Sequence, residues 1–162
     1  MKLSETCRQI SLLLTDVDGV LTDGKLYFSR EGEAMKAFNI KDGMGVKMLQ
    51  GSGIKVGIVT GRESMMVTKR AAELNIDIVY QGIEDKESTV VKIINSLNIT
   101  PAQIAYIGDD LNDLPALNIA GLSACPADAA AQVRNEADYV CRKSGGEGVL
   151  REVAELIFKY KI

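Results

Sequence analysis

The stretch ISLLLTDVDGVLTDG, residues 10–24, joins an apolar run to a turn that carries two aspartates. An apolar run without alternating polar residues is typical of a strand covered on both faces, as in a parallel sheet. Ligands bind to such sheets beyond the carboxyl ends of the strands, which is where Asp16 and Asp18 fall. The pattern Asp-x-Asp-Gly is only moderately specific alone, because turns favour Asp and Gly and calcium loops are also rich in Asp.

The rest of the chain alternates strand-like and helix-like segments, which favours an α/β fold with a Rossmann-like, doubly wound parallel sheet. We expect a single domain over residues 1–162, because this length suits one hydrophobic core. The expected strands are residues 10–14, 54–59, 76–80, 104–107, 121–124 and 138–141. The expected helices are residues 42–50, 63–74, 86–97, 113–118, 126–135 and 148–159.

A β-hairpin is expected at about residues 25–40, with strands at 25–29 and 34–40 around a loop that contains glycine. After it, Asp42 is expected to cap a helix and Gly51 to end that helix in a left-handed conformation. The hairpin and this helix fill nearly all of residues 17–59, which leaves no room for a second domain inserted there.

The composition excludes several kinds of protein. The chain has no histidine, which excludes Ser-His-Asp hydrolysis, Cys-His proteolysis and zinc held by histidine. Its three cysteines, Cys7, Cys125 and Cys141, are far apart and are expected to be reduced thiols. The net charge of -3 and the scattered basic residues predict no binding to nucleic acid.

The sequence also predicts no association with a membrane. No apolar stretch approaches the ~20 residues that a membrane-spanning helix needs. The amino terminus, with Glu5 and only a short apolar run, lacks the layout of a signal peptide. We therefore expect a cytoplasmic protein whose partner is a small molecule.

Three further motifs follow the aspartate pair in order along the chain. Thr60 comes directly after the expected strand 54–59, Lys86 opens a helix, and the run GDDLND, residues 108–113, follows the strand 104–107. Together the four motifs resemble those of the haloacid dehalogenase superfamily of phosphotransferases, over about residues 12–113. The resemblance implies a phosphatase, with the hairpin standing where other members carry a cap domain.

The resemblance implies a catalytic role for four residues. Asp16 would attack phosphorus and form an aspartyl-phosphate, a use of carboxylate nucleophiles that divides one hard step into two. Asp18 would protonate the leaving oxygen and then accept a proton from the attacking water. Thr60, with the backbone amides beyond it, would bond phosphate oxygens, and Lys86 would neutralise the charge of the nucleophile and the phosphate.

The same motifs imply an all-oxygen site for Mg²⁺, which takes one or two carboxylates together with waters and substrate phosphate. The expected ligands are Asp16, the backbone carbonyl of Asp18, and Asp109. Asp110 and Asp113 are further candidate ligands. Asp113 also has an ordinary interpretation as the cap of the helix that follows it.

Motifs beyond this core resemble one capless branch of the superfamily, the 3-deoxy-D-manno-octulosonate 8-phosphate phosphatases, nearly end to end. They are residues 16–24, 41–43, 60–62, 81–86 and 145–152. The branch implies hydrolysis of this sugar-acid phosphate in lipopolysaccharide precursor synthesis. It also implies a homotetramer in which hairpins gather into a central barrel and each subunit caps its neighbour, which would replace the missing lid.

An anionic sugar acid needs cations beyond the metal. Arg62, beside Thr60, is the best candidate, because a guanidinium group can bind two oxygens at once. The other candidate substrate-binding residues are Gly61, Thr22 and Arg70. The glycine-rich residues 145–148, within a C-terminal segment at about 144–162, are expected to form a mobile tail that reaches an adjacent site, or else a turn before the last helix.

Three alternatives remain open. The first is a relative that hydrolyses a nine-carbon, sialic-acid-like sugar acid 9-phosphate; it carries Glu after its Thr-Gly pair, whereas Arg62 stands there in this chain. The second is a phospho-accepting receiver domain, a non-enzymatic signalling module, whose motifs occur in a different order. The third is a catalytically silent regulatory homologue, against which the intact Asp16 and Asp18 argue.

Overall fold

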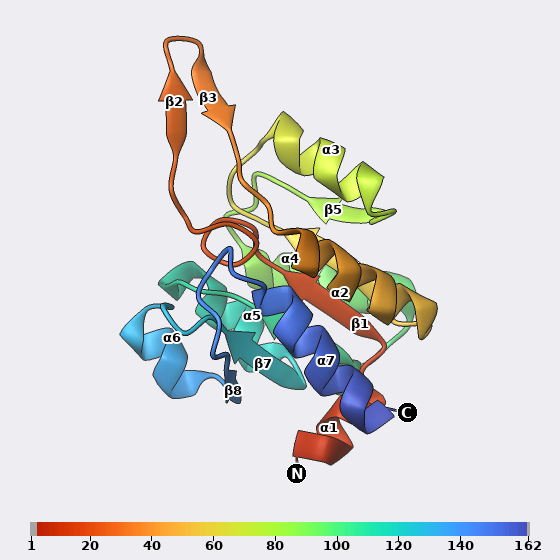
Figure 1. Ribbon diagram of the computed structural model, residues 1–162. Helices are drawn as coiled ribbons and strands as arrows, with labels where there is room; N and C mark the ends of the chain where they lie inside the picture. Colours follow the sequence, from red (N-terminus) through yellow and green to blue (C-terminus); the bar gives the residue numbers. More distant parts are fainter. Residues whose placement is uncertain (1–2, 162) are drawn as a thin grey trace.

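The computed structural model describes residues 3–161 and contains one six-stranded sheet with helices on both faces (Figure 1). Every neighbouring pair of strands in this sheet is parallel. In spatial order the strands are β5 (Ile78–Tyr80), β4 (Lys55–Val59), β1 (Leu12–Thr15), β6 (Ile104–Ile107), β7 (Leu122–Cys125) and β8 (Tyr139–Val140). The predicted Rossmann-like α/β fold is confirmed.

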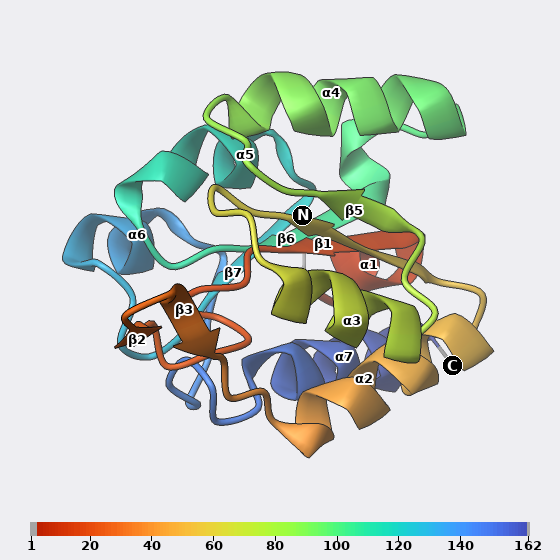
Figure 2. The same cartoon turned by 90° about the horizontal axis from the view of Figure 1, so that it is seen from above.

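Helices form a layer on each face of the sheet (Figure 2). One layer contains α1 (Leu3–Gln9), α2 (Ile40–Gly51), α3 (Met65–Glu73) and α7 (Val149–Lys161). The other contains α4 (Lys86–Leu97), α5 (Leu114–Ile119) and α6 (Ala131–Glu136). Two short 3₁₀ turns, Pro101–Gln103 and Leu111–Asp113, precede β6 and α5. Helix α1 has no counterpart among the predicted elements, and α6 begins five residues later than the predicted start at Pro126.

Strand β1 lies at the centre of the sheet and is completely buried. Leu13 packs into the core beneath α2 and α7, while Leu12 and Leu14 pack into the core beneath α4. This burial on both faces explains the apolar run without alternation. Just beyond the strand, the Asp16 amide donates to the Ile107 carbonyl at 2.9 Å, so the acidic turn begins at the middle of the sheet's carboxyl edge.

The hairpin consists of β2 (Tyr27–Ser29) and β3 (Gly32–Met35), paired antiparallel and projecting away from the sheet (Figure 1). Its second strand is shorter than predicted, because the chain leaves the strand after Met35 and α2 already begins at Ile40. Among the described residues, we find no helix whose length and apolar character would let it cross a bilayer. The cytoplasmic location stays a prediction.

The predicted cap and stop of α2 were wrong. Asn39, not Asp42, is the N-cap: its backbone is extended and its side chain accepts from the Lys41 amide at 2.9 Å. The left-handed residue beyond the helix is Gly53, with φ of +75°, whereas Gly51 still belongs to the helix. Both corrections concern which of two suitable residues adopts the required backbone conformation.

Candidate active site

A pocket opens at the carboxyl edge of the sheet, where the loops after β1, β4 and β6 meet. It contains seven of the predicted site residues. They are Asp16, Asp18, Thr60, Gly61, Arg62, Asp109 and Asp110, and the lining also includes Gly19, Gly24 and Asn112. Lys86 and Asp113 do not line the pocket, because their side chains are fully buried beneath it.

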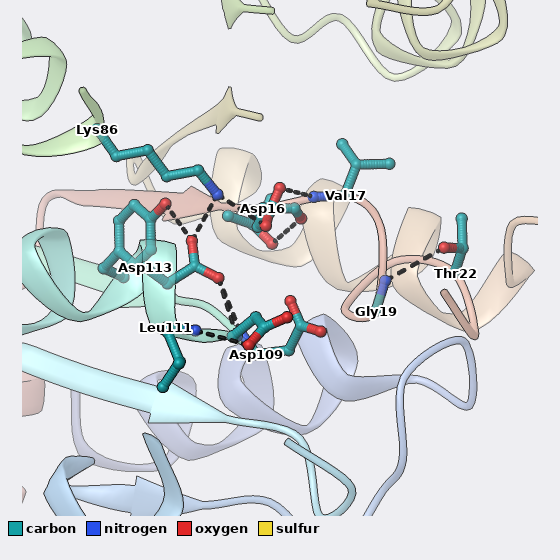
Figure 3. Close-up of polar contacts among 11 residues, drawn as sticks. Asp16, Val17, Gly19, Thr22, Lys86, Asp109, Leu111 and Asp113 are labelled. Carbon is teal, nitrogen blue, oxygen red and sulfur yellow. Dashed lines mark hydrogen bonds and ion pairs between the residues drawn. The ribbon is translucent and has the colours of Figure 1, made fainter. Parts of the chain in front are cut away.

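Lys86 and two aspartates form a buried network under the pocket (Figure 3). The Nζ atom of Lys86 lies 2.8 Å from Oδ2 of Asp16 and 2.6 Å from Oδ1 of Asp113. Helix α4 presents this lysine from its first position, since the Asp85 side chain caps the helix by accepting from the Ser88 amide. The sheet and this helix thus bring together the predicted nucleophile and the predicted cation.

Asp113 is hydrogen-bonded through both carboxylate oxygens. Its Oδ1 also accepts from the Tyr106 hydroxyl at 3.0 Å, and its Oδ2 accepts from the amides of Asp109 at 2.9 Å and Asp110 at 3.3 Å. A metal ion would have to compete for these oxygens. Asp113 is therefore better placed to fix the loop that carries Asp109 and to hold Lys86 than to bind a metal ion directly.

The converging carboxyl groups repel one another, which raises their pKa values. Burial and the neighbouring Asp113 raise the pKa of Asp16 to about 6, against the opposing effect of Lys86. Burial, Asp113 and Asp16 raise the pKa of Asp109 to about 8. Burial alone would lower the pKa of Lys86, but its two aspartate partners raise it, so the lysine stays charged.

This donor set fits a hard divalent cation. One oxygen each from Asp16, Asp109 and Asp113 lies within 4.8 Å of the others. Mg²⁺ prefers carboxylate and water oxygens, and its charge would relieve the repulsion that raises the pKa values of Asp16 and Asp109. Of the three, Asp16 and Asp109 have the carboxylates that also line the open pocket.

The turn after β1 is shaped by its own hydrogen bonds. The Thr22 hydroxyl accepts from the amides of Gly19 at 3.3 Å and Gly24 at 3.2 Å, and Thr22 is buried away from the pocket. A side chain at Gly19, whose φ is +85°, would place its Cβ 2.0 Å from Asp109 Oδ2. Thr22 therefore stabilises the turn after β1. Gly19 allows this turn to lie close to the loop after β6, which carries Asp109.

The two candidate arginines lie in different places, and one of them lines the pocket. Arg62 is exposed and lines the pocket, as its position beside Thr60 predicts. Arg70 is not among the pocket residues: its guanidinium group bonds Glu73 at 3.0 Å and the Asn39 carbonyl at 3.4 Å and lies over the Phe38 ring. The structure of the single chain therefore brings only Arg62 to the site.

The glycine-rich segment before α7 packs against the acidic turn of its own chain. The Gly146 amide donates to the Val20 carbonyl at 3.0 Å, and the Asn39 side chain donates to the Gly146 carbonyl at 3.0 Å. The Gly145 amide donates to Asp128 at 2.9 Å. Within the single chain the segment forms a turn before α7, and its reach to an adjacent site stays a prediction.

Three residues near the site were missed at the sequence level. Asn112 lines the pocket, the Tyr106 hydroxyl reaches Asp113, and Lys36 contacts Asp18 at 2.5 Å. A tyrosine within the otherwise apolar β6 was an available signal, since a buried hydroxyl needs a partner. Lys36 belongs to no motif, and only the folded position of the hairpin brings it to the site.

Comparison with known proteins identifies the family. A model described as haloacid dehalogenase-like hydrolase matches residues 72–153. A 3-deoxy-D-manno-octulosonate 8-phosphate phosphatase from Haemophilus influenzae is 40% identical over 97% of this chain and 87% of its own length. The chain belongs to the haloacid dehalogenase-like hydrolases. The predicted resemblance is thereby confirmed.

Other haloacid dehalogenase-like hydrolases agree in sequence and structure. An Escherichia coli phosphatase of the same name is 45% identical over 91% of this chain and 79% of its own length. The Moraxella catarrhalis phosphatase, solved with a magnesium ion, a phosphate ion and a KDO molecule, is 42% identical with a TM-score of 0.95 over 98% of this chain and 91% of that one. A cobalt-bound Haemophilus influenzae structure gives 40% identity and a TM-score of 0.94 over 96% and 91% of the two chains.

Proposed function

We propose that this chain is a Mg²⁺-dependent phosphatase that hydrolyses 3-deoxy-D-manno-octulosonate 8-phosphate to the free sugar acid and phosphate, in lipopolysaccharide precursor synthesis. The observation that carries the proposal is a pocket lined by Asp16 and Asp18, in which the buried Lys86 is bonded to Asp16. Relatives with this activity in their names are 40 to 45% identical over most of the chain.

Two residues carry the bond changes in this proposal. Asp16 attacks phosphorus while Asp18 gives its proton to the leaving sugar oxygen, so the ester bond breaks as the aspartyl-phosphate forms. Asp18 then takes a proton from water, which attacks the aspartyl-phosphate and releases phosphate from Asp16. Asp16 is bonded to Lys86 and to the Val17 amide at 2.7 Å, which orients its carboxylate for the attack.

The remaining pocket residues bind and neutralise charge. Lys86 offsets the negative charge of Asp16, and Thr60 and the amides after it offer donors for phosphate oxygens. Asp16, Asp109 and the Asp18 carbonyl would hold Mg²⁺, with Asp110 at the edge of the same pocket. When bound, this ion supplies positive charge beside the transferring phosphate.

Arg62 is the proposed contact to the substrate's sugar-acid part. It is exposed in the pocket, where its fork can reach an anionic group. The nine-carbon sugar acid 9-phosphate remains the second candidate substrate, because it offers the same two anionic groups. Arg62→Glu should lower activity on the eight-carbon ester more than on the nine-carbon ester, and equal losses would refute this role.

We also propose that the chain works as a homotetramer in which a neighbour covers the pocket. The hairpin exposes apolar side chains, with Leu26 at 44%, Phe28 at 62% and Met35 at 51%, as expected of a surface that another subunit covers. Analytical ultracentrifugation should give four subunits. A monomer that remains fully active would refute both the assembly and the shared lid.

The decisive experiment measures phosphate release from the eight-carbon and nine-carbon esters with Mg²⁺. The wild-type protein should turn over the octulosonate ester many times per chain, and Asp16→Asn should abolish this turnover. Preference for the nine-carbon ester would replace the substrate and keep the mechanism. A single phosphate per chain would indicate a receiver-like module, and no reaction at all would indicate a silent homologue.

A further inference from the structure

Lys36 is a buried cation at the base of the exposed hairpin. It directly follows β3, and its side chain is only 2% exposed. Its Nζ atom lies 2.5 Å from Oδ1 of Asp18 and 2.9 Å from Oε1 of Glu33. Burying an ammonium group is costly unless its partners are well placed. The hairpin therefore makes a specific, charged contact with the acidic turn, beyond the apolar surface that it exposes.

The contact with Asp18 is one-sided. Lys36 is bonded to Oδ1, while Oδ2 of Asp18 has no hydrogen-bond partner within residues 3–161. Asp18 lines the pocket, so the unbonded oxygen is the one available to a substrate. A carboxylate fixed at one oxygen loses little freedom when the other oxygen meets its reaction partner.

Glu33 completes the arrangement from the other side. Burial would lower the pKa of Lys36, but its bonds to Asp18 and Glu33 raise the pKa above the usual value. The Lys36 ammonium group lies between the carboxyl groups of Asp18 and Glu33, at 2.5 Å and 2.9 Å. Because Glu33 belongs to β3, the position of the ammonium group follows the position of the hairpin.

We propose that Lys36 is a positioning residue for proton transfer: held by Glu33, it fixes the Asp18 carboxyl group so that Oδ2 exchanges the proton with the substrate oxygen. The inference rests on the proposed acid-base role of Asp18. It adds a part of the hairpin to the reaction machinery, acting through Asp18 and without touching the substrate.

The test compares two phosphate esters that differ in their need for an acid. A sugar alkoxide must be protonated as it leaves, whereas nitrophenolate leaves without help. For Lys36→Met we expect kcat on octulosonate 8-phosphate to fall about 30-fold or more with KM nearly unchanged, as loss of acid catalysis predicts. The rate of the first nitrophenol burst from p-nitrophenyl phosphate should stay within about threefold, because that step bypasses the acid.

Two further variants separate positioning from folding. Lys36→Arg keeps the charge and should recover part of the lost kcat. Lys25→Met removes a hairpin lysine that is 74% exposed and 3.5 Å from Asp23, and it should leave both rates unchanged. Equal losses on the two esters for Lys36→Met, or a wild-type kcat, would overturn the inference.

The outcome for the wild-type protein tells the two proposals apart. If it does not hydrolyse the octulosonate ester, the proposed substrate fails, and the same ratio is measured on whichever alkyl phosphate the protein does hydrolyse. A selective loss there would still support Lys36. If the wild-type protein hydrolyses no alkyl phosphate, both the proposed function and the positioning role fail.

Discussion

The ammonium group of Lys86 lies 2.8 Å from Oδ2 of Asp16, although 70 residues separate them in the sequence. Both side chains are buried, and the same ammonium group holds Asp113. One lysine therefore compensates two carboxylates under the pocket. This sharing explains why Asp16 can be buried beside another acid, and it ties the stability of the fold to the chemistry of the site.

Replacing Lys86 with Met should damage both activity and stability. We expect kcat to fall by about 10²-fold or more, as when a charge-stabilising group is removed. The free energy of unfolding should drop by about 3–5 kcal/mol at pH 8, because two buried carboxylates lose their cation, and by less at pH 5, where one can take up a proton. Lys92→Met, on the exposed side of the same helix, is the control. Enzyme assays and urea unfolding test both parts, and an unchanged kcat would contradict the first.

Binding of Mg²⁺ should strengthen as pH rises. The pKa of Asp109 is raised to about 8, so below this pH the ligand must lose a proton before the metal binds. Affinity should increase about tenfold per pH unit between pH 6 and pH 8 and then level off. Calorimetry in two buffers with different ionisation enthalpies should count about one proton released per ion at pH 7. If the Mg²⁺ affinity of Asp109→Asn still rises with pH, the released proton comes from another group.

Asp42 should make the protein less stable as pH rises. It is 4% exposed and accepts from the Arg151 amide at 3.0 Å, and burial raises its pKa from 3.8 to about 6. The unfolded chain therefore loses the Asp42 proton at a lower pH than the folded chain, and ionisation between about pH 4 and pH 6 favours unfolding. Asp42→Asn keeps the acceptor for Arg151 and cannot ionise. It should match the wild type near pH 4 and exceed it by about 3 kcal/mol above pH 7.

Urea unfolding of both proteins across this pH range measures the difference. The comparison with Asp42→Asn cancels the contributions of Asp16 and Asp109, which titrate in both proteins. A stability difference that does not change between pH 4 and pH 7 would show that Asp42 does not titrate in the folded chain.

Gly145→Ala should disturb the acidic turn. The new Cβ would lie 2.1 Å from the Gly19 carbonyl, so one of the two backbone segments has to move. We expect a loss of about 1–3 kcal/mol in stability and a fall in kcat, because the displaced segment carries the Asp18 turn. Gly51→Ala is the matched control, since nothing lies within 4 Å of its added methyl group and α2 is helical there. Equal effects of the two substitutions on kcat would refute this link.

The sheet could be predicted closely because its signal is local. Strand β6 has the predicted bounds, since four buried residues, all apolar except Tyr106, lie between polar turns. Which residue caps α2 could not be predicted, because Asn39 and Asp42 are both suitable. In the folded chain the Asp42 side chain instead accepts a hydrogen bond from the Arg151 amide, which lies 109 residues away in the sequence.

The site residues that directly follow strands of the sheet could be predicted from the sequence. The contacts of residues on the hairpin and on α3 could not. Asp16, Thr60 and Asp109 meet because parallel strands end at one edge of the sheet. Lys36 reaches Asp18 only through the path of the hairpin, and Arg70 faces Asn39 and Glu73 because of how α3 packs. Contacts of this kind depend on tertiary structure, and the sequence pattern carries no trace of them.

The hairpin makes no strand pairing with the six-stranded sheet, so its length and sequence can change without shifting the register of any core strand. Residues 29–32, at the turn between β2 and β3, could therefore be exchanged for longer or differently charged loops. Glu33 and Lys36 would be retained as the fixed boundary of each graft, so that the acidic turn keeps its contact with Lys36. A library built at this position would vary the tip of the hairpin without changing any strand pairing of the six-stranded sheet.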